Sequence, residues 1–184
     1  MNEHLKPIFE VLLPGLEDTQ IDYWVFGGIS IAAYARKFIR ENRDVDIFLR
    51  DTDFEQARSI LDDLCSQNSF ILKHGSKEAD ERPKVEVKID GSERFSMIPV
   101  YQKDNTVAFK YKDGDQKYPT QILERVERNI SGFRFFTSSD EFIKGMFINH
   151  IKARPDKMKR EKIIKDAKAI LNSEEQANLG FPLD

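Results

Sequence analysis

A short apolar run, a pair of glycines, a helical pattern and a second apolar run with two aspartates follow one another near the start of this chain. The first run covers residues 23–26 (YWVF) and ends at Gly27 and Gly28. The second run follows Asp44 directly and contains Asp46. Short apolar runs that alternate with a helix favour strands of one sheet with the helix packed on it.

The two aspartates are spaced for one face of a strand. Residues i and i+2 point the same way, so the carboxylates of Asp44 and Asp46 are expected roughly 7 Å apart along the strand. Two carboxylates this close are unfavourable unless a cation lies between them. Mg²⁺ prefers oxygen ligands and often binds together with substrate phosphates. The local chemistry therefore suggests a metal–nucleotide site.

A purely structural interpretation is the alternative. The glycines would form a tight turn into the helix, Asp44 would cap the strand, and Asp46 would face solvent. The neighbours of Asp46 argue against this, because it lies between Val45 and Ile47. An exposed strand position more often carries Thr or Lys.

This order of elements resembles the nucleotidyltransferase superfamily, whose members carry Gly-Gly or Gly-Ser before a helix and Asp-x-Asp on the next strand. The likeness is greatest to the aminoglycoside and lincosamide nucleotidyltransferases. Sixteen positions separate Gly28 from Asp44, and residues 40–43 (RENR) lead into the aspartates. The resemblance covers residues 22–50 and implies an α+β fold: a nucleotidyltransferase-like mixed β-sheet flanked by helices, with a short C-terminal helical addition.

The resemblance also implies an activity: metal-dependent transfer of a nucleoside monophosphate from an NTP to a hydroxyl acceptor, with release of pyrophosphate. Asp44 and Asp46 would be catalytic and would hold one or two Mg²⁺ (or Mn²⁺) ions. Gly27 and Gly28 would let the backbone approach the triphosphate at the start of the helix.

Two further polar residues fall near this expected nucleotide site. Ser30 would add a hydroxyl donor for phosphate. Arg43, or Arg40, would contact a phosphate, with a solvated surface charge as the equal alternative.

A third carboxylate completes such sites in the superfamily, and the matching position here is Ser96. Serine is a poor metal ligand and not a base at neutral pH. Glu86 could replace it as a catalytic residue if the hairpin loop is 90–92, because Glu86 then lies opposite Ser96. If the loop is 91–92, Val87 faces Ser96 and Glu86 points the other way. The sequence leaves both registers open.

The patterns in the rest of the chain predict further strands and helices. We expect a core over residues 1–137 and a helical segment over residues 138–184 packed on it. The expected helices are 3–13, interrupted by Pro14-Gly15, then 28–38, 54–66, 121–128, 140–151 opened by a capping box at 138–141, and 156–172. The expected strands are 22–26, 45–49, 69–73, 84–89, 94–101, 106–111 and 132–136.

Composition narrows the class of partners. The net charge is −3, which gives no electrostatic case for nonspecific nucleic-acid binding. The N-terminal residues show no basic region and no long apolar run, and no stretch reaches membrane-spanning length, so we expect a cytoplasmic protein with no membrane partner. The single Cys65 excludes an intrachain disulfide and is expected to be buried.

Lys and Arg gather in residues 152–168. Related enzymes carry a Lys-Asp-x-x-Asp-like stretch on such a helix, and Lys165-Asp166 matches its beginning without the second acid. We expect Lys162, Lys165 and Asp166 to form a solvated helix face. The alternative, implied by the resemblance, is that the basic residues lie near substrate or phosphate.

Three functions remain open at this point. In the first, the acceptor is a small hydroxyl-bearing molecule. In the second, it is a macromolecule such as a protein or a tRNA end, as in toxin–antitoxin members of the superfamily. In the third, the protein is inactive and binds nucleotide or a protein partner. A nucleic-acid acceptor is not favoured and would need residues 152–168 as its basic tract. A polycationic aminoglycoside would need an acidic pocket, for which residues 74–93 are the candidate. The sequence does not fix the oligomeric state.

Overall fold

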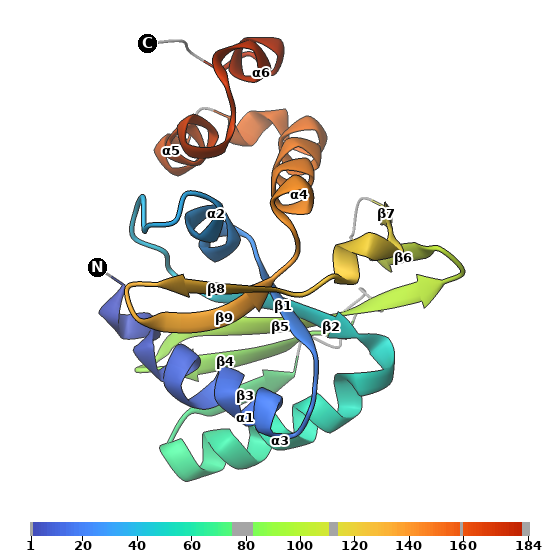
Figure 1. The fold of residues 1–184 in the computed structure, drawn as a ribbon. Helices are drawn as coiled ribbons and strands as arrows, with labels where there is room; N and C mark the ends of the chain where they lie inside the picture. Colours follow the sequence, from blue (N-terminus) through green and yellow to red (C-terminus); the bar gives the residue numbers. More distant parts are fainter. Residues whose placement is uncertain (1, 75–82, 111–113, 159, 182–184) are drawn as a thin grey trace.

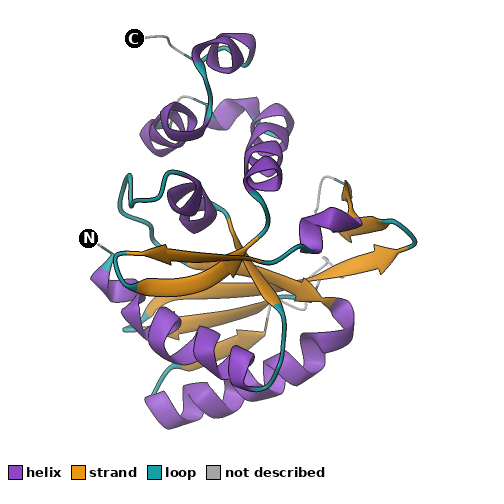
Figure 2. Cartoon of the chain, in the orientation of Figure 1, coloured by secondary structure: helices purple, strands orange, loops and turns teal. Residues whose placement is uncertain are grey.

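The computed structural model describes residues 2–74, 83–110, 114–158 and 160–181, which form a mixed sheet of nine strands with helices on both faces (Figures 1 and 2). The strands are β1 Tyr23–Phe26, β2 Val45–Arg50, β3 Ile71–His74, β4 Val85–Ile89, β5 Ser92–Lys103, β6 Thr106–Phe109, β7 Gln116–Pro119, β8 Val126–Ile130 and β9 Phe133–Thr137. The helices are α1 Leu13–Asp18, α2 Gly28–Tyr34, α3 Phe54–Asn68, α4 Asp140–Ala153, α5 Glu161–Ile170 and α6 Ser173–Asn178. Among these residues no helix combines the length and the apolar character needed to cross a bilayer.

The strand order is β3-β4-β5-β2-β1-β9-β8, and β6 and β7 extend as an antiparallel arm from β5. β2 is antiparallel to β1 and parallel to β5, while β5 is antiparallel to β4. The register aligns Phe26, Asp46, Ser96 and Glu86 in one row across four strands. These side chains therefore share one face of the sheet.

The two faces of the sheet are covered by different helices. Figure 1 shows α1 and α3 on one face, and α2 with the C-terminal helices on the other. A cluster of buried apolar side chains joins Ile31 of α2 to Ile143 and Phe147 of α4 and to Ile163 of α5. The C-terminal helices are thus held over the face that carries Asp46.

Most of the expected elements are present, but several boundaries differ. The expected interruption at Pro14-Gly15 is wrong: a π-helical turn at Ile8–Leu12 continues directly into α1. Pro14 lies in the first turn of α1, directly after the π-helical turn. Gly15 leaves room for Leu64 of α3, since a Cβ there would lie 2.5 Å from a methyl carbon of Leu64.

Other differences lie toward the C-terminal half. The expected helix 121–128 is a 3₁₀ turn at Thr120–Leu123 followed by β8, which pairs with β9. The side chain of Ser139 makes no capping hydrogen bond, so the expected capping box is wrong; Ser138 instead donates a hydrogen bond to the carbonyl of Ile122. The last expected helix is shorter, and β7 and α6 were not expected from the sequence.

Candidate active site

Asp44 and Asp46 both line a cavity of about 750 Å³ between the sheet and the C-terminal helices. Asp44 precedes β2 and is 41% exposed; Asp46 is the second residue of β2 and is half-buried. Asp46 Oδ1 accepts a hydrogen bond from Ser96 Oγ on β5. Asp44 Oδ2 lies 3.5 Å from Nε of Arg43.

Asp46 carries a perturbed carboxyl group. Burial, the largest cause, raises the pKa of Asp46 above its ordinary value, the hydrogen bond from Ser96 lowers it, and the negative charge of Asp44 raises it. The net result is a pKa above that of a solvated aspartate. A bound cation would oppose both causes that raise the pKa, because it favours the ionised form.

The register of the β4–β5 hairpin answers one question that the sequence left open. The loop is Asp90-Gly91, with Ile89 opposite Ser92, so neither expected loop is correct. A bulge then shifts the pairing between Val87 and Lys88 by one residue. Glu86 consequently lies opposite Ser96, as the longer loop would have required.

Glu86 nevertheless does not reach the cavity. It lies two strands from Asp46, which corresponds to about 10 Å between backbones. Its carboxylate lies 2.5 Å from the ammonium of Lys84, and neither Glu86 nor Ser96 lines the cavity. A catalytic role for Glu86 stays a prediction that requires this ion pair to open.

The two glycines are required by local geometry. Gly27 has φ +70°, and a Cβ there would lie 3.2 Å from Oδ2 of Asp46. Gly28 begins α2, and a Cβ there would lie 2.6 Å from Nη2 of Arg40 and would also overlap the side-chain oxygen of Asn42. Only glycine lets this turn pass so close to the carboxylate and to the loop before Asp44.

The other predicted binding residues also line the cavity. Ser30 is 4% exposed and donates its hydroxyl proton to the carbonyl of Gly27, 2.9 Å away. The side chain of Arg43 is 73% exposed beside Asp44. Their contacts with phosphate stay predictions.

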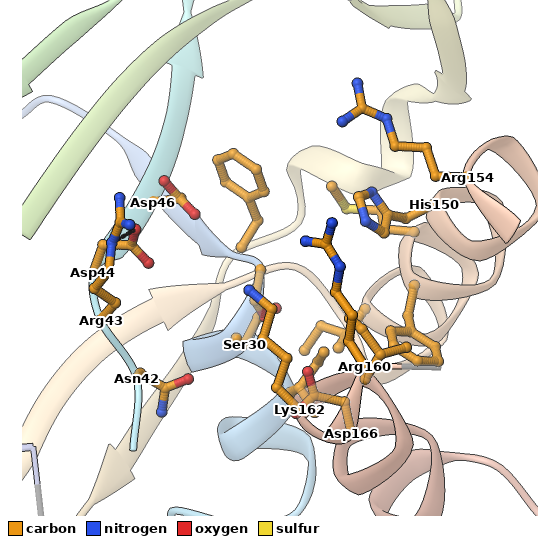
Figure 3. A pocket seen from close by; sticks show the side chains of 18 of the residues that line it. Ser30, Asn42, Arg43, Asp44, Asp46, His150, Arg154, Arg160, Lys162 and Asp166 are labelled. Carbon is orange, nitrogen blue, oxygen red and sulfur yellow. Dashed lines mark hydrogen bonds and ion pairs between the residues drawn. The ribbon is translucent and has the colours of Figure 1, made fainter. Parts of the chain in front are cut away.

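The opposite wall of the cavity is basic and comes from the C-terminal helices. Figure 3 shows His150, Arg154, Arg160 and Lys162 across the cavity from Asp44 and Asp46. The concentration of Lys and Arg in residues 152–168 was the only sequence signal for this wall. Which of these side chains face inward depends on the break between α4 and α5.

Asp166 departs most clearly from expectation. It was expected on a solvated helix face, but it is 2% exposed and pairs with Arg40. Lys165 follows the expectation, since it is half-exposed and pairs with Glu161 one turn away. No sequence pattern indicated that a residue near Asp44 would contact α5.

The carboxylate pair fits a divalent cation. No cluster of three or more acidic, His or Cys side chains able to hold a metal occurs among the described residues. Mg²⁺ often takes only one or two protein carboxylates and completes its shell with water and phosphate oxygens. Asp44 and Asp46, side by side at the cavity floor, match that donor set.

The fold and this site define a nucleotidyltransferase-like protein. ANT(2'')-Ia in complex with adenylyl-2''-tobramycin superposes with a TM-score of 0.64 at 15% identity, over 96% of this chain and 94% of that one. The lincosamide adenylyltransferase LnuA, lincomycin-bound, superposes with a TM-score of 0.61 at 17% identity, over 90% and 94%. The profile of the Aminoglycoside-2''-adenylyltransferase family matches residues 8–127, more than half of the chain, so the chain belongs to that family. No curated protein sequence matches it.

Proposed function

We propose that the protein transfers a nucleoside monophosphate from an NTP to a hydroxyl group of a small acceptor. The acceptor oxygen attacks the α-phosphorus, a new P–O bond forms, and the bond to the β-phosphate oxygen breaks. Pyrophosphate leaves and the hydroxyl proton passes to solvent or to a nearby base. The observation that carries the proposal is the pair Asp44 and Asp46 at the floor of a cavity of about 750 Å³.

Each wall of the cavity would have its own task. Asp44 and Asp46 would hold a divalent cation, which neutralises phosphate charge when bound. Arg154, Arg160 and Lys162 would attract the anionic nucleotide from the facing wall. The glycine turn would leave room for the nucleotide beside Asp46. Glu86 would serve as the third acid only after leaving Lys84.

A small acceptor is favoured over a macromolecule. A nucleic-acid acceptor would need the basic residues of 152–168 on an open surface. Arg154, Arg160 and Lys162 line the cavity, so this part of the basic tract faces the proposed nucleotide site. The similar structures of ANT(2'')-Ia and LnuA hold adenylyl-2''-tobramycin and lincomycin, which makes aminoglycosides and lincosamides the first acceptors to test.

The acidic residues expected to form a pocket for an aminoglycoside can be followed only in part. Glu86, Asp90 and Glu93 do not line the cavity. Residues 78, 80 and 81 lie outside the described part of the chain. Among the described residues, Glu41 and Asp115 line the cavity and are available to meet a cationic acceptor.

Nucleotide binding without turnover is the second candidate function. Ser96 stands at the position expected for the third acid and is hydrogen-bonded to Asp46. Both candidates require a nucleotide at Asp44 and Asp46, and they differ in whether an acceptor is modified.

The decisive experiment is calorimetric titration of ATP and GTP with and without Mg²⁺. Metal-dependent binding is expected for the wild type and is expected to disappear in Asp44→Ala/Asp46→Ala. Asp62→Ala/Asp63→Ala is the matched control, because it removes two exposed carboxylates of α3, on the far face of the sheet. If folded wild-type protein binds neither nucleotide, the proposal is wrong. Product formation with tobramycin or lincomycin then separates the two candidates.

A further inference from the structure

The loop that delivers Asp44 has no helix or strand of its own. It runs from the end of α2 at Tyr34 to the start of β2 at Val45. Side chains from distant parts of the chain hold it. The side-chain oxygen of Asn2 accepts a hydrogen bond from the backbone N–H of Asn42 at 2.7 Å, and Nη1 of Arg94 donates to the carbonyl of Arg43 at 3.1 Å.

An ion pair joins this loop to the C-terminal helices, next to Ile39, which packs against their apolar cluster. Nε of Arg40 donates to Oδ1 of Asp166 at 2.7 Å, and Nη2 donates to Oδ2 at 2.9 Å. The side chains are 15% and 2% exposed. The partners are 126 residues apart in sequence. Two parallel hydrogen bonds between planar groups fix both distance and orientation.

The ends of this pair lie next to functional side chains. Arg40 is four residues before Asp44, and its Nη2 lies beside the glycine turn at Gly28. On α5, Lys162 is one turn before Asp166, so the two side chains share a helix face. Both Lys162 and Asp166 line the cavity. The pair therefore couples the carboxylate floor to the basic wall.

A contribution to stability alone is a weak reason for such a pair. Removing charged groups from water costs about as much as their attraction returns, and apolar replacements of similar volume are often neutral. What the bidentate pair supplies is a defined geometry. Arg40 is held by Asp166 at the edge of the cavity that it helps to line, and its contact with a phosphate stays a prediction.

We infer that Asp166 is a positioning residue for the carboxylates Asp44 and Asp46, acting through Arg40. The inference rests on the proposed function, because it assigns Asp166 a task in metal and nucleotide binding. In this role Asp166 touches neither metal nor nucleotide. It keeps the loop before Asp44 at a fixed distance from the basic wall.

The test is the double variant Arg40→Met/Asp166→Leu, which leaves no unpaired charge. We expect thermal unfolding close to that of the wild type. The Mg²⁺ concentration that half-saturates ATP binding is expected to rise about tenfold, the size of effect typical for groups that orient metal ligands. Mn²⁺ binding without nucleotide, followed by electron paramagnetic resonance, is expected to weaken in the same direction.

The control is Arg128→Met/Asp140→Leu. This pair has Nη2 of Arg128 2.6 Å from Oδ1 of Asp140 and joins β8 to α4, but neither residue lines the cavity. Its removal is expected to leave metal affinity unchanged. Arg40→Lys is a second test variant, because it keeps the buried carboxylate of Asp166 paired with a cation but loses the bidentate geometry. It is expected to weaken metal binding in part.

The outcomes separate this inference from the proposed function. If wild-type protein binds Mg²⁺ and ATP, and both Arg40→Met/Asp166→Leu and Arg40→Lys bind them equally well, the inference is wrong and the proposed function stands. If the wild type binds neither, both fall together. Weaker metal binding by the folded variants, with the Arg128 control unchanged, supports a positioning role.

Discussion

The hydroxyl of Ser96 donates a hydrogen bond to the carboxylate of Asp46 across two parallel strands. A serine thus occupies the place beside Asp46 where the superfamily resemblance implies an acid. It satisfies one oxygen of Asp46 without adding negative charge. The role of Ser96 can be tested by adding a carboxylate at this position and by removing the hydroxyl.

Ser96→Asp is expected to add a third carboxylate to the row. Without metal the added charge faces Asp46 in a partly buried place, so the free energy of unfolding should fall by about 1–3 kcal/mol. Mg²⁺ should restore much of that loss and bind more tightly than to the wild type. Thermal unfolding with and without Mg²⁺ measures both effects. Ser96→Ala removes the hydrogen bond without adding charge and should not gain metal affinity; equal Mg²⁺ responses in all three proteins would contradict the prediction.

The raised pKa of Asp46 predicts a pH dependence of stability. Its pKa in the folded protein lies above the ordinary value of 3.8, so the folded state disfavours the charged carboxylate. The stabilising contribution of the protonated group is complete below the unfolded pKa and is lost as pH rises through the folded pKa. In the absence of metal, Asp46→Asn should therefore be more stable than the wild type at neutral pH.

Urea unfolding across pH measures this difference. The advantage of Asp46→Asn should shrink as pH falls toward 3.8, because the wild-type carboxyl group then becomes neutral as well. Mg²⁺ should stabilise the wild type and have little effect on Asp46→Asn. A variant that is less stable than the metal-free wild type at neutral pH would show that burial is not the main influence on Asp46.

The parts of the fold that follow local patterns could be predicted from the sequence. The order of β1, α2 and β2, and the positions of Asp44 and Asp46, follow from apolar runs and glycines that act within a few residues. The position of Glu86 could not be predicted. It depends on a bulge at Lys88, and one residue of slip reverses the face of every side chain in a strand.

The contact of Arg40 with Asp166 could not be predicted from the sequence for another reason. An aspartate among lysines on an amphipathic helix resembles a solvated face, and only the packing of α5 over α2 buries it. The inward direction of Arg154 and Arg160 was not expected from the sequence either. Their direction depends on the turn between α4 and α5 and not on spacing within one helix.

Glycine at position 27 is expected for two reasons, its backbone conformation and its closeness to Asp46, and two variants can distinguish them. Gly27→Ala forces a side chain into φ +70° and within 3.2 Å of Asp46 Oδ2. Gly91→Ala is a matched control with φ +74° and open space around the position. Both should lose about 1–3 kcal/mol of unfolding free energy from backbone strain, with the larger loss at Gly27, whose ψ of −143° lies outside the left-handed helical region. Only Gly27→Ala should also weaken Mg²⁺-dependent ATP binding; an equal effect of both variants on binding would argue that the close approach to Asp46 has no role in the site.

Substitutions of Lys162 and Lys165, which lie on the same helix, test whether the basic wall binds nucleotide. Lys162 lines the cavity, whereas Lys165 pairs with Glu161, 2.6 Å away. If the wall attracts nucleotide phosphate, Lys162→Ala should weaken ATP binding by about tenfold, since a hydrogen bond to a charged group contributes about 1.5–3 kcal/mol. Lys165→Ala should bind ATP as the wild type does. The loss should be smaller for AMP, which carries fewer phosphate charges, and smaller at high salt, because screening weakens charge attraction. Calorimetric titration with ATP and AMP at two salt concentrations measures these differences. An equal loss of affinity for both nucleotides would indicate that Lys162 contacts the nucleoside or the acceptor and not the triphosphate.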